Sequence, residues 1–380
     1  MVMTPRAGTG TRRRVGELDW KLAVAAVAVA AFGAIMIYTA TKSGLAVSGL
    51  DGRYFLKRQG VFVILGCLVM LFLWRSDYRR IEQVATAVYV ALIVLLAAVL
   101  SPFGSNALGA QRWFVVGPFQ IQPSEFAVLA VILAVSTYCN RRPEGLTLRD
   151  VSRLLLMTGV PMGLILLQPD LGTCIILAIV LLVMLAVAGI PGRLLLLLLA
   201  AAVLVMVVAV EGGFLSSYQI HRLTSFLNQN STNPQLQGVI YNVKQAKIAI
   251  GSGGIWGAGI GHGAQTNLGY VPEQQTDFIF TAVGEQLGFI GSTVLLGALG
   301  FIGYRILRAS ITAKDALGRV LCAGVFAFFT FSVFQNAGMT MGIMPVTGIP
   351  LPFMSYGGSA ALVFFVAVGL VLSVEARRGG

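Results

Sequence analysis

Charged residues are scarce in this chain. Asp, Glu, Lys and Arg together make up 11% of its 380 residues, whereas a soluble domain carries about 25%. That shortage excludes a water-soluble globular protein. Apolar residues take their place, at 57% of the total, in runs long enough to cross a hydrocarbon core of about 30 Å. The composition therefore predicts an all-α integral membrane protein.

Cysteine and histidine are also rare. The four cysteines have no CxxC spacing, and the two histidines lack the spacing of metal ligands. This pattern argues against a disulfide framework and against a structural zinc site. The sequence also contains no Walker loop and no dinucleotide-binding fingerprint. The chemistry of the chain must therefore be sought in its few acidic and basic residues.

About ten transmembrane helices are expected from the apolar runs. A short hairpin at QPDLGT should join the fifth and sixth spans, because a proline followed by Asp and Gly is typical of a turn. The predicted spans are residues 20–40, 54–73, 81–100, 123–139, 154–167, 171–188, 194–210, 278–303, 316–341 and 353–374.

The distribution of basic residues predicts the orientation. Nineteen of the 27 Lys and Arg residues lie in the two termini and the even-numbered loops or in the first turn of an adjoining span, which by the positive-inside bias places both termini in the cytoplasm. Residues 1–17 then form a basic cytoplasmic tail, and residues 18–380 form one polytopic membrane domain with a long extracytoplasmic loop at 211–276. The net charge of +12 is explained by this bias and by anionic membrane lipids, so no nucleic-acid partner is needed.

Acidic residues at the predicted outer helix ends are the candidates for function. Asp277 closes the polar stretch PEQQTD, directly before an apolar run. On a helix that starts there, Thr281, Gly284, Glu285 and Gly288 would share a face with Asp277. Glu285 would lie about two turns, roughly 12 Å, deeper, where an acid is costly unless it faces a cavity or a partner. Both a functional role and a buried acid paired with hydrogen-bond donors are open for Glu285.

Basic residues on the same predicted side could complete an outer cavity. The candidates are Arg112, Arg222, Lys244 and Lys247, the last two on a short predicted interfacial helix at 241–254. A positively charged cavity floored by carboxylates suits an anionic, lipid-linked substrate. The glycines of GSGGIWGAGIGHG would let the backbone approach a bulky ligand.

Six segments, in order, resemble the signature segments of the SEDS (shape, elongation, division and sporulation) family of bacterial cell-wall synthesis. They are QRWFVVGPFQIQPSEFA, QPDLGT, YQIHRLTSFL, KIAIGSGGIWG, VPEQQTDFIF and PVTGIPLPFMSYGGS. The resemblance runs from about Leu18 to the C-terminus. The first span and the long loop are more similar to the rod-shape branch of the family than to the division branch.

The resemblance implies a peptidoglycan glycosyltransferase that polymerises lipid II at the outer face of the bacterial cytoplasmic membrane during elongation. It also implies a class B penicillin-binding protein as the crosslinking partner. The catalytic aspartate of the family falls on Asp277, with Glu273 and Thr276 beside it. Other family positions fall on Glu125, Lys247 and Arg222, and Asp170 lies in QPDLGT.

The chain departs from the family pattern at three positions. The usual lysine three residues after the glutamate is Val128, the usual Gly-Lys-Gly has Ala258 at its centre, and the usual second glutamate of a pair is Gln286. Glu125 therefore cannot form an ion pair with a lysine three residues further along its helix.

Two questions about mechanism stay open in the sequence. Asp277 would act either as a general base or as a ligand of a divalent cation such as Mg²⁺ or Mn²⁺. A lipid II flippase is the alternative function, but transporters carry ionisable groups near mid-membrane. Here the charged outer cluster has no matching inner one, and only Glu285 approaches mid-depth, which favours chemistry at the surface.

Overall fold

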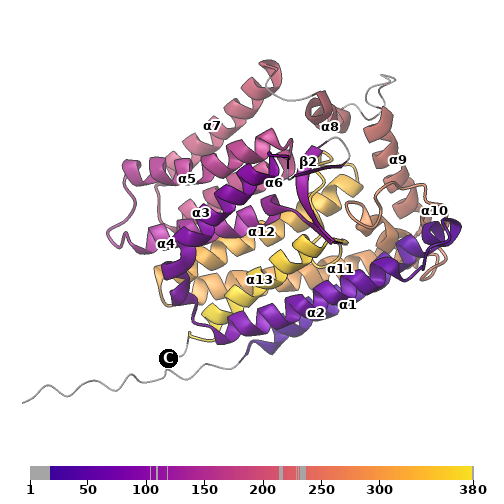
Figure 1. Ribbon diagram of the computed structural model, residues 1–380, viewed down its shortest axis with the longest axis horizontal. Coiled ribbons are helices and arrows are strands. Elements are labelled where there is room, and N and C mark those ends of the chain that lie inside the picture. Colours follow the sequence, from indigo (N-terminus) through magenta and orange to yellow (C-terminus); the bar gives the residue numbers. More distant parts are fainter. Residues whose placement is uncertain are drawn as a thin grey trace, which may run out of the picture.

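The computed structural model describes residues 18–102, 104–107, 110–117, 119–213, 217–227, 229, 231 and 237–378. The predicted tail at 1–17 lies outside these residues. Figure 1 shows the described chain as a bundle of long helices with one small sheet. The helices are α1 (Trp20–Val47), α2 (Tyr54–Arg75), α3 (Ile81–Val99), α4 (Pro123–Asn140), α5 (Leu148–Leu167), α6 (Leu171–Val187), α7 (Gly192–Glu211), α8 (Ser217–Leu227), α9 (Gln237–Ser252), α10 (Ala264–Asn267), α11 (Ile279–Thr312), α12 (Ala316–Thr340) and α13 (Gly358–Glu375), with a 3₁₀ turn η1 (Tyr78–Arg80).

The predicted fold class is confirmed. Nine helices of the described chain are long and apolar enough to cross a membrane, and α6 is a shorter apolar helix of 17 residues. Each of the ten predicted spans coincides with one of these helices. The turn at QPDLGT separates α5 from α6, where the Asp170 side chain accepts a hydrogen bond from the backbone N–H of Thr173. That bond caps the start of α6.

Several predicted boundaries were wrong. Helix α1 ends at Val47, seven residues beyond the prediction, and α5 begins at Leu148, six residues before it. The last span begins at Gly358 rather than at residue 353, because the preceding residues form a turn in which the N–H groups of Met354 and Ser355 donate to the Leu351 carbonyl. Helix α11 runs on to Thr312, nine residues beyond the prediction. Hydropathy marks the apolar part of a helix, and the polar turns that continue the helix into water have no such signal.

The core lies between α4, α12 and α13. In α13, 83% of the apolar window is buried within the protein, whereas in α7 the share is zero. Figure 1 places α7 at the edge of the bundle, so most of its side chains face the membrane. In the LLLLLL run of α7, Leu196, Leu197 and Leu199 are exposed towards lipid, whereas Leu194, Leu195 and Leu198 pack against the bundle. Helices α12 and α13 carry the packing that positions the site.

Helix α11 is broken at Gly288, whose φ of 64° and ψ of −160° are not helical. The loop after α9 fills the break: the N–H of Ala258 donates to the Glu285 carbonyl, and the N–H of Phe289 donates to the Gly254 carbonyl. A Cβ on Gly257 would come within 2.3 Å of the Gln286 carbonyl oxygen. The glycines of this loop therefore let its backbone approach α11 closely. Their approach to a ligand stays a prediction.

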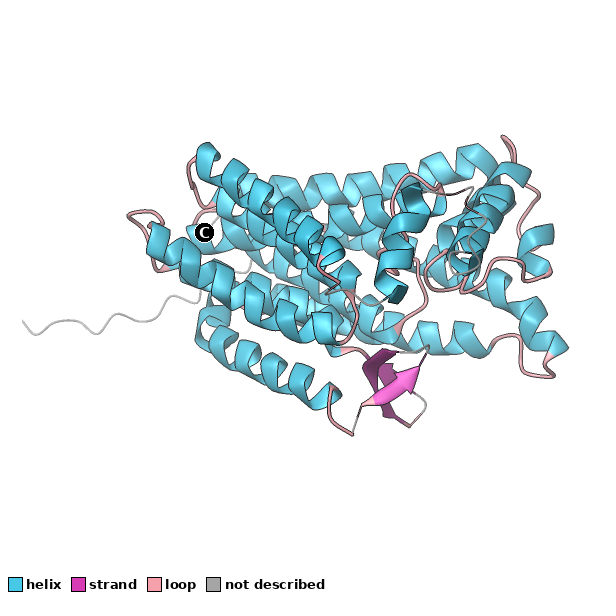
Figure 2. Cartoon of the chain, turned by 90° about the horizontal axis from the view of Figure 1, so that it is seen from above, coloured by secondary structure: helices cyan, strands magenta, loops and turns pink. Residues whose placement is uncertain are grey.

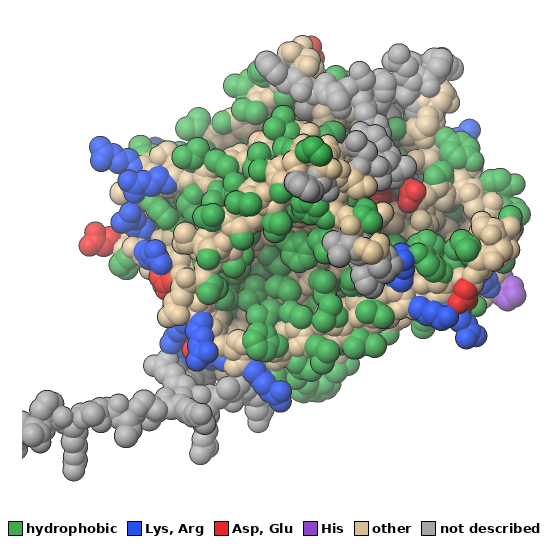
Figure 3. All heavy atoms as spheres, in the orientation of Figure 1, with side chains coloured by type: hydrophobic (Ala, Val, Ile, Leu, Met, Phe, Trp, Pro, Cys, Tyr) green, Lys and Arg blue, Asp and Glu red, His purple; other side chains and the backbone are tan. Residues whose placement is uncertain are grey.

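Residues predicted to be cytoplasmic share one end of the bundle. Ion pairs there join Arg305 to Asp19, Arg79 to Asp315 and Arg377 to Asp77. Figure 3 shows Lys and Arg side chains gathered along the edge near the C-terminus. The shared end fits the predicted topology, and the side of the membrane that it faces stays a prediction.

A three-stranded antiparallel sheet lies between α3 and α4. Its strands are β1 (Ser105–Ala107), β2 (Ala110–Val116) and β3 (Phe119–Ile121), with β2 in the centre. Figure 2 shows the sheet beside the helical body, at the ends of the helices. Strand β2 carries Arg112 and Trp113 to the wall of a cavity.

Candidate active site

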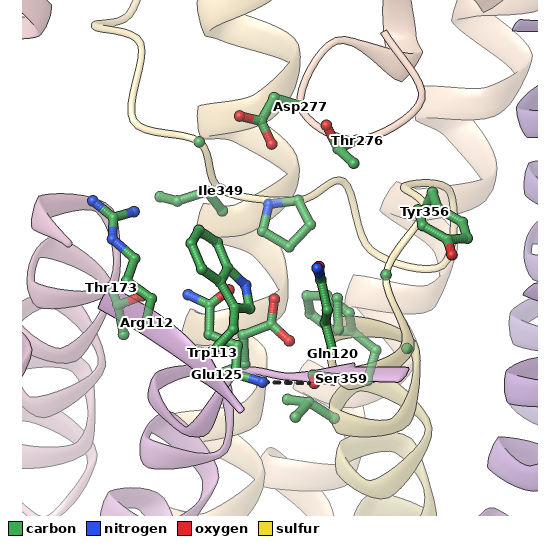
Figure 4. A pocket seen from close by; sticks show the side chains of 18 of the residues that line it. Arg112, Trp113, Gln120, Glu125, Thr173, Thr276, Asp277, Ile349, Tyr356 and Ser359 are labelled. Carbon is green, nitrogen blue, oxygen red and sulfur yellow. Dashed lines mark hydrogen bonds between the residues drawn. The ribbon is translucent and has the colours of Figure 1, made fainter. Parts of the chain in front are cut away.

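A cavity of about 640 Å³ opens beside Asp277. Residues far apart in the sequence line it, from α2, β2, α4, α8, α12, α13 and the segments before α6, α11 and α13. Figure 4 shows Asp277 and Thr276 on one side of this space, with Glu125, Arg112 and Trp113 opposite. Its charged lining residues are Glu125, Asp170, Glu273, Asp277, Arg58, Arg112 and Arg222. The structure thus brings together seven of the nine predicted site residues. They are Arg112, Glu125, Asp170, Arg222, Glu273, Thr276 and Asp277.

Asp277 is held by its backbone. The Glu273 carbonyl accepts hydrogen bonds from the N–H groups of Thr276 and Asp277, at 3.2 and 3.1 Å. The Asp277 carbonyl accepts one from Asn336 Nδ2 at 2.9 Å. These bonds make a turn directly before α11 and leave the carboxylate on the cavity wall, half-buried.

Burial raises the pKa of Asp277 to about 6, against the opposite effect of the Arg222 guanidinium. Removal from water disfavours the charged carboxylate, and a nearby cation favours it. A carboxyl group with this pKa exchanges its proton near neutral pH, as a general base must.

The side chains of Asp277 and Arg222 both approach Gly348. A Cβ at this position would lie 3.2 Å from Asp277 Oδ2 and 3.4 Å from Arg222 Nη1. The backbone of Gly348 has φ of +76°, a conformation that residues with a Cβ rarely adopt. Glycine therefore gives both charged groups room beside the 343–357 segment.

Asp170 and Glu125 differ although both line the cavity. Asp170 is satisfied: it caps α6 through the Thr173 N–H and accepts from Thr173 Oγ1 at 2.9 Å and from Ser124 Oγ at 3.1 Å. Glu125 Oε2 is buried and has no hydrogen-bond partner among the described residues. Val128, one turn further along α4, is buried. The departure from the family pattern thus leaves an apolar side chain where a lysine would stand.

The arginines reach the cavity in different ways. Arg112 donates to the carbonyls of Gln168 and Pro169, tying β2 to the turn before α6. Arg58 of α2, which sequence reasoning missed, lies over the ring of Tyr54 at 4.2 Å. Arg58 lies at the predicted outer end of an apolar span, and this position could have marked it as a candidate for the outer cavity. Glu273 and Thr276 lie at the rim, where Thr276 Oγ1 donates to Glu273 Oε2 at 3.3 Å.

Two predicted residues lie outside the cavity lining. Lys247 is exposed on α9 and donates to Gln229 Oε1 at 2.7 Å. Glu285 is buried and accepts from the N–H of Gln265 at 2.7 Å and from the N–H and Oγ1 of Thr266 at 2.9 and 2.6 Å. It therefore caps α10, which is the paired-acid alternative left open by the sequence.

Within the described ranges, no group of three or more His, Cys, Asp or Glu side chains could hold a metal ion. A Mg²⁺ ion often binds through one or two carboxylates and the phosphates of a substrate. Glu125, whose Oε2 has no hydrogen-bond partner among the described residues, is the cavity carboxylate that would serve in that way, since Asp170 is engaged in capping.

Comparisons with known proteins agree with this arrangement. A family model described as "Cell cycle protein", covering FtsW, RodA and SpoVE, matches residues 19–379. The chain is 35% identical over 366 residues to the probable peptidoglycan glycosyltransferase FtsW of Trichlorobacter lovleyi, covering 96% of this chain and 94% of that protein. It is 35% identical over 363 residues to the peptidoglycan glycosyltransferase MrdB of Escherichia coli K12, covering 95% and 94%.

Solved structures agree as well. A chain of a peptidoglycan synthase complex that coordinates polymerization and crosslinking has a TM-score of 0.79 at 31% identity, with 95% of this chain and 98% of that chain covered. The rod shape determining protein RodA of Thermus thermophilus has a TM-score of 0.70 at 30% identity, with 96% and 98% covered. With its apolar spans and a match over nearly its whole length, the chain is a multi-pass protein of the bacterial inner membrane and belongs to the SEDS family.

Proposed function

We propose that this protein is a peptidoglycan glycosyltransferase that polymerises lipid II, with Asp277 as its general base. The observation that carries the proposal is the cavity itself, which Asp277 lines together with three arginines and with Glu125, whose Oε2 has no hydrogen-bond partner among the described residues. The relatives named peptidoglycan glycosyltransferase, MrdB and FtsW, support the same activity. The rod-shape resemblance and the match to RodA favour a role in elongation.

The reaction joins an acceptor sugar to a donor sugar carried on a lipid pyrophosphate. The Asp277 carboxylate takes the proton of the acceptor hydroxyl as its oxygen attacks the anomeric carbon of the donor. The bond from that carbon to the pyrophosphate oxygen breaks at the same time. A positioned proton transfer of this kind contributes about 10²–10⁴ in rate.

The leaving pyrophosphate is anionic and needs cationic partners. Arg58, Arg112 and Arg222 line the same cavity, and guanidinium groups pair with phosphate oxygens through parallel hydrogen bonds. A divalent cation held by Glu125 would supply further positive charge to the leaving group. The arginines alone give the cavity its fit to a lipid-linked pyrophosphate.

A class B penicillin-binding protein is the proposed partner. Support comes from the chain at TM-score 0.79, which belongs to a synthase complex that coordinates polymerization with crosslinking. In such a pair this protein would make glycan strands and the partner would crosslink them. The two activities are separable, because a β-lactam blocks only the transpeptidase.

The test is glycan synthesis by purified protein in detergent, with its penicillin-binding partner added. Detergent leaves no leaflets, so transport contributes nothing to the signal. We expect lipid II to be converted into strands in the presence of a β-lactam, and this product to disappear with Asp277→Asn, which keeps the size of the side chain. Absence of polymer from the partnered complex, together with movement of lipid II between leaflets in liposomes, would establish the flippase instead.

A further inference from the structure

We propose that Asn336 of α12 is a positioning residue that fixes the Asp277 carboxylate against the cavity. The proposal rests on the function proposed above, and it concerns a residue that does not line the cavity. Asn336 is fully buried, at 0% exposure. A buried amide is unusual unless its hydrogen bonds serve a defined purpose.

Asn336 joins two segments through one nitrogen. Its Nδ2 donates to the Asp277 carbonyl at 2.9 Å and to the Ile349 carbonyl at 2.8 Å. The first carbonyl belongs to the turn before α11, and the second belongs to the segment before α13. Two hydrogens on one nitrogen thus hold the backbones that carry Asp277 and Gly348 next to each other.

Asn336 acts through the two N–H donors of its side-chain amide. Asn336 Oδ1 accepts from none of the described residues. Because both neighbours of Nδ2 are carbonyl oxygens, only the nitrogen can occupy that place. An aliphatic side chain of similar volume would remove both bonds and leave two carbonyls without these donors.

The clamp controls a crowded point of the site. Gly348 directly precedes Ile349, and both Asp277 Oδ2 and Arg222 Nη1 approach it. A second link between the same segments runs from the Tyr356 N–H, at the far end of the segment before α13, to the carbonyl of Gln275, two residues before Asp277, at 2.8 Å. Loss of the Asn336 bonds would free the end that carries Asp277, while the Tyr356 link would keep the segments associated.

Loss of the Asn336 hydrogen bonds should displace the Asp277 carboxylate and leave substrate binding unchanged. An error of about 1 Å in a reacting group can lower the rate about 10²-fold. The cavity arginines lie on α2, β2 and α8, so the binding of the pyrophosphate does not depend on Asn336. The acid limb of the pH profile should also move, because the pKa of Asp277 depends on its burial and on Arg222.

Asn336→Leu is the main test, and Gln335→Leu is its matched control. Gln335 is the preceding residue of α12, is equally buried, and donates to the Pro345 carbonyl at 2.7 Å. It therefore touches the segment before α13 and makes no hydrogen bond to the turn that carries Asp277. Asn336→Ser, which keeps one donor, covers the case in which the leucine variant does not fold.

Each purified full-length variant is assayed with the partner and lipid II, and its thermal unfolding is followed in the same detergent. For Asn336→Leu we expect kcat to fall about 10- to 100-fold, KM to change less than threefold, and the midpoint of the acid limb to move by about half a pH unit. Asn336→Ser should lose less activity, with a shift of the midpoint in the same direction. Gln335→Leu should keep the midpoint of the wild-type protein.

Two results would overturn the inference. One is an Asn336→Leu or Asn336→Ser protein with the kcat and midpoint of the wild type. The other is a loss of activity that Gln335→Leu reproduces at equal thermal stability, which would make the role of Asn336 structural. A wild-type protein without polymerase activity would refute the proposed function itself and is distinguishable from both.

Discussion

Asp277→Asn should inactivate the protein and stabilise its fold at the same time. The carboxylate lies half-buried at the cavity wall, where burial raises its pKa to about 6 from an ordinary value of 3.8. The charged carboxylate therefore lowers the free energy of unfolding, because the unfolded chain exposes it to water and the folded protein partly buries it. An asparagine of the same size removes that charge, and the polymerisation rate should fall by about 10²–10⁴ because the general base is lost.

The size of the stabilisation follows from the two pKa values. Each pKa unit corresponds to about 1.36 kcal/mol, so the rise from 3.8 to about 6 amounts to about 3 kcal/mol. Water in the open cavity screens part of this, and we expect about 1–3 kcal/mol for the variant at neutral pH. The apparent Tm should rise by a few degrees.

The sign of the pH dependence is specific. Because the folded-state pKa is raised, the folded protein binds this proton more tightly than the unfolded chain does. The wild type is therefore least penalised below about pH 4, loses stability as the pH rises towards 6, and carries the full cost above it. The Tm difference between Asp277→Asn and wild type should shrink between pH 8 and pH 5.

The assay is thermal unfolding of both purified proteins in one detergent from pH 5 to pH 8, alongside strand synthesis over the same range. Wild-type synthesis should decline below pH 6 as Asp277 becomes protonated. An asparagine variant that is less stable than wild type at pH 8 would refute the reasoning, because it would mean that the charged carboxylate gains more from its surroundings than it loses to burial.

Three further predictions concern neighbouring features. Gly348→Ala should lower activity at least tenfold, because its Cβ would press on Asp277 Oδ2; Gly49→Ala, with a similar φ of +70° and open space around it, isolates the backbone cost. If the two variants lose equal activity, crowding at Gly348 is irrelevant. Glu285→Gln should lower the apparent Tm, opposite in sign to Asp277→Asn, since an amide nitrogen replaces an oxygen that accepts from backbone N–H groups; its activity should stay within tenfold of wild type, and a greater loss at unchanged Tm would contradict a capping role. Lys244 is exposed on α9, on the predicted outer side, so Lys244→Cys should react with an impermeant maleimide in intact spheroplasts. Arg142 is exposed on the predicted cytoplasmic side, so Arg142→Cys should react only after lysis. The reverse pattern would mean that the predicted topology is inverted.

Local patterns were enough for the spans and for the position of Asp277. Apolar runs of membrane-spanning length depend on composition alone, and a carboxylate at the edge of such a run can be recognised without a partner. The capping Asp170 could be found in the same way, because a cap bonds to residues of its own turn. These features depend on neighbours within a few positions along the chain.

Glu285 and Asn336 show what the sequence left open. Periodicity placed Glu285 on the face of Asp277, but the loop that fills the break at Gly288 and the turn at α10 supply its hydrogen-bond donors. Asn336 reads as one polar residue in an apolar helix, and its role depends on carbonyls 59 and 13 residues away. The amino-acid sequence determined where helices cross the membrane and which acid stands at the edge. Only the tertiary structure decided which charged groups share the cavity, because buried polar groups take whichever partners distant segments bring within about 3 Å.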